Sequence, residues 1–95
     1  MKPGWVYIMA NRYRGTLYIG ATSSLPHRAM QHRDKAGSGF AAKYGCVLLV
    51  YVEEHAEIAA AIYRERQLKK WNRDWKIRLI EEQNPDWRDR FDDLI

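Results

Sequence analysis

A single acidic residue interrupts an apolar helical stripe in the second half of the 95-residue chain. The apolar members of the stripe are Ile58, Ala61, Ile62 and Leu68. Their spacing of three and four residues predicts one face of a helix, and Glu65 falls on the same face. Burying a carboxylate there is unfavourable unless a cation neutralises it, so Glu65 is a candidate metal ligand. A salt bridge to an arginine, or a helix rotated to expose Glu65, would explain the pattern equally well.

An arginine and a histidine one helical turn apart suit an anionic ligand. Arg28 and His32 are four residues apart in LPHRAMQH, so a helix would project both from one side. The guanidinium can donate several hydrogen bonds to phosphate oxygens, and the imidazole can pass a proton or donate to phosphate. The same residue types are common on solvated helix surfaces, so neither one is specific by itself.

Two tyrosines lie inside aliphatic stretches near the N-terminus. Residues 4–10 and 16–21 alternate as strands do, and the turn residues in NRYRG between them predict a hairpin. Alternation places Tyr7 and Tyr18 on the face opposite the aliphatic side chains, with Gly20 beside them leaving room for a group to approach the backbone. We expect a core face and a phenol-bearing face, although plain core packing of both rings is the simpler alternative.

Helical and strand patterns account for the rest of the chain. They predict a helix from Ser23 or Ser24 to Gly37, a loop over 37–45 with one helical turn, a central strand over 46–53, and helices over 56–70 and 72–83. In the last of these, the inward residues are expected to be Trp71, Trp75, Leu79 and Ile80. A final short helix would be capped by Asn84 and opened by Pro85. This order predicts one α+β domain over residues 1–95, with a small, mainly antiparallel three-stranded sheet flanked by helices.

Composition limits the partners and the compartment. Residues 1–80 carry 14 Lys and Arg against 6 Asp and Glu, whereas residues 81–95 carry 2 against 6. A basic body suits a polyanion such as nucleic acid. The one cysteine, Cys46, adjoins an apolar run and predicts a buried thiol in a reducing, cytoplasmic compartment. No stretch is typical of a signal peptide, a membrane span, a zinc site or a nucleotide-binding loop.

The hairpin motifs resemble a known family. The sequence WVY at residues 5–7 is separated by ten residues from YIG at residues 18–20, and this pair is similar to the paired motif of the GIY-YIG nuclease superfamily. Further matches follow in order over residues 4–90: Arg28 and His32 in LPHRAMQH, Glu65 in YRERQLKKW, and Asn84 in NPDW. The similarity is greatest to small stand-alone members that resemble the N-terminal domain of the excinuclease C subunit. The first motif departs from the family because its glycine, Gly4, stands one place upstream of WVY.

The resemblance implies a metal-dependent DNA endonuclease that is structure-selective or weakly sequence-specific and acts in DNA repair or processing. The implied catalytic set is Tyr7, Tyr18, Arg28, His32, Glu65 and Asn84. Glu65 would hold Mg²⁺ or Mn²⁺, and Arg28 would neutralise charge on the phosphate. Tyr7 would accept a proton from the attacking water or orient it, and the choice of general base stays open. Asn84 is explained equally well as a helix cap.

Basic residues near the implied site predict phosphate contacts with the substrate. The nucleic-acid-binding candidates are Lys43, Arg64, Arg66, Lys69, Lys70, Arg73 and Lys76. The expected partner is DNA in a branched, nicked or single-stranded form, with no membrane partner. Two alternatives remain: a nucleic-acid-binding module without catalysis, and a small protein that docks on a repair complex through its tryptophans.

Overall fold

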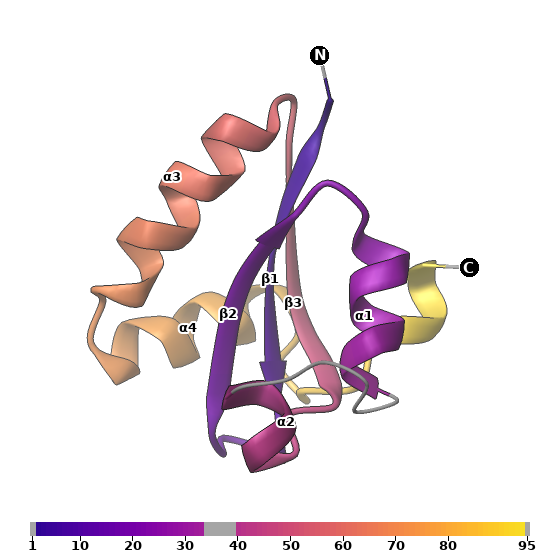
Figure 1. Ribbon diagram of the computed structural model, residues 1–95. Coiled ribbons are helices and arrows are strands. Elements are labelled where there is room, and N and C mark those ends of the chain that lie inside the picture. The colour runs from indigo at the N-terminus through magenta and orange to yellow at the C-terminus, as the bar shows by residue number, and fades with distance from the viewer. Residues whose placement is uncertain (1, 34–39, 95) are drawn as a thin grey trace.

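In the described part of the chain, three strands and five helical segments form an α+β fold (Figure 1). The computed structural model describes residues 2–33 and 40–94, with the backbone alone for 32–33 and 40–41. The strands are β1 (Gly4–Ala10), β2 (Leu17–Thr22) and β3 (Leu48–His55). The helices are α1 (Leu25–Arg33), α2 (Phe40–Tyr44), α3 (Ile58–Lys69), α4 (Arg73–Gln83) and the short 3₁₀ helix η1 (Phe91–Leu94). The predicted fold class is confirmed. None of the helices in the described segments is long and apolar enough to cross a membrane.

The sheet has the order β2-β1-β3, with both outer strands antiparallel to β1. The prediction that the strand over 46–53 is central was therefore wrong, because β3 is an edge strand. Its apolar run has another cause, since both faces of β3 are buried: Val50 lies in one core and Leu49 in the other. The C-terminal segment covers the outer edge of β3. The Gln83 amide bonds to both the N–H and the C=O of Val52, at 3.1 and 2.8 Å. Asp89 accepts a further hydrogen bond from the N–H of Leu49 at 3.1 Å.

The two faces of the sheet carry different cores, as the alternation in the hairpin predicted. In the register of β1 and β2, Ile8 lies opposite Ile19, and Tyr7 lies opposite Gly20. The aliphatic face packs against residues of α3 and α4. Tyr7 belongs to the second core, which includes Leu25 and Ala29 of α1. The phenol-bearing face is thus itself largely covered by a helix, as Figure 1 shows for α1.

Gly4 allows α3 to approach β1 closely. A Cβ atom at Gly4 would lie 2.6 Å from the Cα of Ile58 and 3.0 Å from the Cβ of Ala61. No side chain fits there without displacing the helix backbone. The displaced glycine of the WVY motif therefore has a packing role: it seats the helix that carries Glu65.

Two expectations for the C-terminal region were wrong. Trp75 is 52% exposed rather than inward, because Ile80 fills the core side of α4 and Trp75 packs edge-on against Trp71, with ring centroids 5.8 Å apart. Asn84 does not begin a helix but ends α4, where its N–H bonds to the C=O of Ile80 at 2.8 Å. The chain then turns away at Trp87, whose φ of 56° is left-handed and cannot continue a helix.

Candidate active site

The two phenols of the hairpin lie together on the α1 side of the sheet. The ring centroids of Tyr7 and Tyr18 are 6.2 Å apart, and their hydroxyl groups share a hydrogen bond. Tyr7 is 1% exposed, whereas Tyr18 is only partly buried. A Cβ atom at Gly20 would lie 2.4 Å from the Tyr7 hydroxyl oxygen. The space that the sequence predicted beside Gly20 is therefore filled by the ring of Tyr7.

Two more of the predicted residues, Arg28 and Glu65, act electrostatically on Tyr7. Burial raises the pKa of Tyr7 well above its ordinary value, and the neighbouring Tyr18 raises it further. The charge of Arg28 opposes this rise, and the charge of Glu65 adds to it. Both charges are therefore close enough to act on the same hydroxyl. The phenol of Tyr7 on β1 therefore adjoins Tyr18 on β2 and lies within electrostatic range of Arg28 on α1 and Glu65 on α3.

Glu65 lies on α3 and is partly buried. Its side chain is 17% exposed and pairs with Lys69, one turn further along the helix, at 3.1 Å. The open question of why a carboxylate interrupts the apolar stripe thus has a partial answer, because a lysine compensates its charge. Among the described residues, no three His, Cys, Asp or Glu side chains gather in a way that could hold a metal ion.

Arg28 is exposed near the start of α1, where its N–H bonds to the C=O of Ser24 at 3.0 Å. It is accessible to a ligand while its charge still reaches Tyr7. His32 belongs to the same helix, but its side chain lies outside the described part of the structure. The predicted end of this helix at Gly37 also falls outside the described residues.

Asn84 does not join this group. Its side chain is 5% exposed, and its amide donates to the C=O groups of Val50 and Arg88 at 3.1 and 2.9 Å. Its oxygen accepts from the N–H of Arg88 at 3.3 Å. These contacts hold the chain after α4 against β3, a structural role that differs from the N-terminal helix cap expected from the sequence.

The predicted nucleic-acid contacts divide into exposed and internally bonded residues. Lys43 and Lys70 are exposed. Arg73 donates to the C=O groups of Arg14 and Gly15 at 2.5 and 2.7 Å, which ties α4 to the hairpin turn. Lys69 pairs with Glu65, as described above. Neither Arg73 nor Lys69 is free to serve a ligand without giving up part of an internal contact.

Arg64 belongs to a polar cluster that the sequence analysis missed. Its guanidinium donates to Glu53 at 3.1 Å and lies 5.2 Å from the ring centre of Trp71. Glu53 also accepts from the Tyr51 hydroxyl and contacts His55, both at 2.6 Å. The signal was present in the sequence, because Tyr51, Glu53 and His55 alternate on one face of a strand. Arg64 therefore braces α3 against β3 on the side away from the phenols.

Comparisons with known proteins agree with the motifs. A family model described as the GIY-YIG catalytic domain matches residues 3–78, a range that ends before Asn84. A UPF0213 protein of Syntrophus aciditrophicus is 33% identical over 87 residues, which cover 90% of this chain and 98% of the relative. A UPF0213 protein of Staphylococcus haemolyticus is 30% identical over 82 residues, covering 86% and 99%. No solved structure matches. The chain therefore belongs to the GIY-YIG nuclease superfamily.

Proposed function

We propose that this GIY-YIG domain is an endonuclease that hydrolyses DNA phosphodiester bonds with the help of Mg²⁺ or Mn²⁺. The family indicates nuclease chemistry on a nucleic acid. We extend this to DNA repair or processing, with selection by DNA structure or weak sequence preference. The observation that carries the proposal is the paired phenols of Tyr7 and Tyr18, with the charges of Arg28 and Glu65 acting on the Tyr7 hydroxyl.

Arg28 would bind the scissile phosphate and neutralise the negative charge that develops on it. It is exposed, so a bound backbone can reach it, and its charge acts on the buried phenol behind it. Removing one well-placed donor of this kind lowers a rate by roughly 10²–10³-fold. The electrostatic task is therefore assigned to the most accessible member of the group.

The two phenols differ in burial, and this divides their roles. Tyr7 is almost completely buried, and its raised pKa keeps the hydroxyl protonated at neutral pH. A proton acceptor would need the opposite shift, so Tyr7 is better suited to hold Tyr18 in place through their hydrogen bond. Tyr18 is the more exposed phenol and would orient the attacking water or a phosphate oxygen.

The residues present fit a magnesium ion. Mg²⁺ keeps several waters and is commonly bound through one or two carboxylates and substrate phosphate oxygens, which matches the lone Glu65. The ammonium of Lys69, 3.1 Å from that carboxylate, already supplies a positive charge at this place. A divalent cation bound there would supply charge neutralisation on the scissile phosphate. A cation bound to this carboxylate would compete with the ammonium of Lys69.

Cleavage by the purified protein tests the proposal. Supercoiled plasmid, single-stranded DNA and a branched duplex would be incubated with Mg²⁺ or Mn²⁺, and with EDTA as the metal-free control. We expect nicking that needs metal and is lost in Glu65→Gln, a change that keeps the side-chain size. Lys2→Met, an exposed change at the N-terminus, is the matched control and should cleave normally. Metal-dependent cleavage that persists in Glu65→Gln would refute the assignment.

One observation favours a second function, a nucleic-acid-binding module without catalysis. The ion pair between Glu65 and Lys69 satisfies the carboxylate with no metal present. Under this alternative, DNA binding would depend on salt but not on metal, and no substrate would be nicked. The variant Lys69→Met distinguishes the two functions. If Glu65 binds a cation, this variant should cleave DNA faster at a given metal concentration. If Glu65 binds no cation, the variant should only bind DNA more weakly.

A further inference from the structure

Two adjoining hollows follow the outer edge of β2, next to the candidate active site. They have volumes of about 260 and 270 Å³, and Leu17 and Lys76 line both of them. The first is also lined by Tyr18 and Lys69, and the second by Thr16 and Arg73. We call the two together the β2-edge groove. It begins at Tyr18 and Lys69, the ion-pair partner of Glu65, and extends toward the turn of the hairpin.

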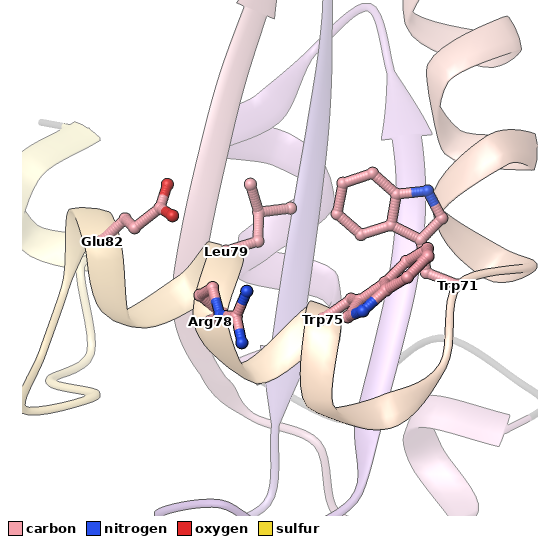
Figure 2. A pocket seen from close by; sticks show the side chains of 5 residues that line it. All are labelled: Trp71, Trp75, Arg78, Leu79 and Glu82. Atoms are coloured by element: carbon pink, nitrogen blue, oxygen red, sulfur yellow. The ribbon is translucent and has the colours of Figure 1, made fainter.

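The charges of the β2-edge groove have one sign. All its charged lining residues are basic, and they are Lys69, Arg73 and Lys76. Another hollow, on α4, has a volume of about 240 Å³ and is shown in Figure 2. That hollow contains both Arg78 and Glu82 beside its tryptophans, so it offers no uniform field to an anion. The β2-edge groove is therefore the better match to a polyanion.

We propose that the β2-edge groove binds the sugar–phosphate backbone of the DNA strand next to the bond that is cut, with Lys76 as its principal phosphate contact. The inference rests on the proposed function, because Tyr18 and Lys69 belong to both the groove and the candidate active site. A strand whose phosphate lies at Arg28 and Tyr18 would continue along β2 into this groove. Leu17 and the ring of Tyr18 would contact its sugars or bases.

Lys76 suits this role better than its basic neighbours. Arg73 is bonded to two backbone carbonyl groups of the hairpin turn, and Lys69 is paired with Glu65. The ammonium of Lys76 makes one long contact, 3.4 Å from the C=O of Lys69. Its remaining donors can serve a phosphate without breaking an ion pair.

Binding without metal tests the groove independently of cleavage. Fluorescence anisotropy would follow a labelled 20-nucleotide strand and the duplex of the same sequence, in EDTA, over a series of salt concentrations. We expect Lys76→Met to weaken binding about fourfold at 0.15 M salt and to reduce the salt slope by about 0.7–0.9, the loss of one phosphate contact. Lys76→Arg should restore affinity, and the matched control Lys2→Met should bind normally.

The outcomes separate the groove from the nuclease proposal. Unchanged affinity and salt slope in Lys76→Met, for both the single strand and the duplex, would overturn the inference even if Glu65-dependent cleavage is observed. Conversely, Lys76-dependent binding by a protein that never cleaves would support the groove and reject only catalysis. Thermal unfolding of Lys76→Met would show whether loss of the contact to Lys69 disturbs the fold. If it does, Lys76→Arg still tests the groove, because it keeps a positive charge at this position.

Discussion

Replacing Gly20 by alanine should displace the ring of Tyr7 without changing its chemical groups. The added methyl group would lie 2.4 Å from the Tyr7 hydroxyl oxygen and 2.5 Å from the ring carbon that bears it, whereas ordinary contact begins near 3.4 Å. The ring would have to move by about 1 Å, by the difference between these distances. It cannot rotate into solvent without losing its burial, since Tyr7 is 1% exposed. Overpacking of this kind lowers the free energy of unfolding by about 1–3 kcal/mol.

The same shift should affect cleavage more than stability. A catalytic group displaced by about 1 Å can lower a rate about 10²-fold, and the hydrogen bond from Tyr7 positions Tyr18. We therefore expect Gly20→Ala to stay folded at 25 °C but to nick DNA about 100-fold more slowly in Mg²⁺ or Mn²⁺. Thermal unfolding and a time course of plasmid nicking would measure the two effects.

Gly45→Ala is the matched control for this experiment. Gly45 has a φ of 66°, so alanine there is strained by roughly 1 kcal/mol, but its Cβ would meet no atom within 4 Å. This variant should lose similar stability and keep its cleavage rate. A folded Gly20→Ala protein that nicks DNA as fast as the parent would refute the view that the phenol pair positions the reaction.

Two further predictions concern residues outside the phenol pair. Asn84→Ala leaves buried carbonyl groups unsatisfied and should lower the free energy of unfolding by about 1–3 kcal/mol. Its cleavage rate per folded molecule should not change. A large loss of rate in a stable Asn84→Ala protein would instead show that Asn84 takes part in catalysis. Although burial opposes its ionisation, hydrogen bonds from Tyr51, His55 and Arg64 hold the pKa of Glu53 below its usual 4.5. Its contribution to stability is therefore complete above about pH 4.5 and is lost as the pH falls through the lowered value. Urea unfolding from pH 3 to 7 should show this loss in the parent and a flatter profile in Glu53→Gln, and parallel profiles would contradict the assignment.

The hairpin was predictable from the sequence because side chains of a strand alternate between only two faces. Once Ile8 and Ile19 share a buried face, Tyr7 and Tyr18 must share the other one, and the observed register confirms this. What alternation cannot reveal is whether the second face is covered. Here Leu25 of α1 covers it, so Tyr7 is buried rather than presented to solvent.

The C-terminal region was less predictable because its residues act through distant partners. Asn84 before proline is typical of a helix start, but its amide bonds to Val50 on β3 instead. Trp75 fits the apolar spacing of α4, yet the core beneath that helix is already filled by Ile80. Likewise, Arg64 has the composition of a phosphate contact, while its actual partner, Glu53, lies on a strand that local sequence patterns do not connect to it. Propensity and periodicity describe one helix or strand at a time, whereas these contacts join residues of two different elements, so the sequence patterns could not reveal them.

Adjacent residues on α3 connect the stabilising cluster to the candidate active site. Successive side chains on a helix are about 100° apart, so Arg64 and Glu65 leave α3 in different directions on either side of its buried stripe. Arg64 is fixed to Glu53 on β3, and this contact sets the rotation of the helix about its axis. Glu65, the next residue along α3, acts electrostatically on Tyr7. Neighbouring positions of one helix therefore link the Glu53 cluster on β3 to the candidate active site.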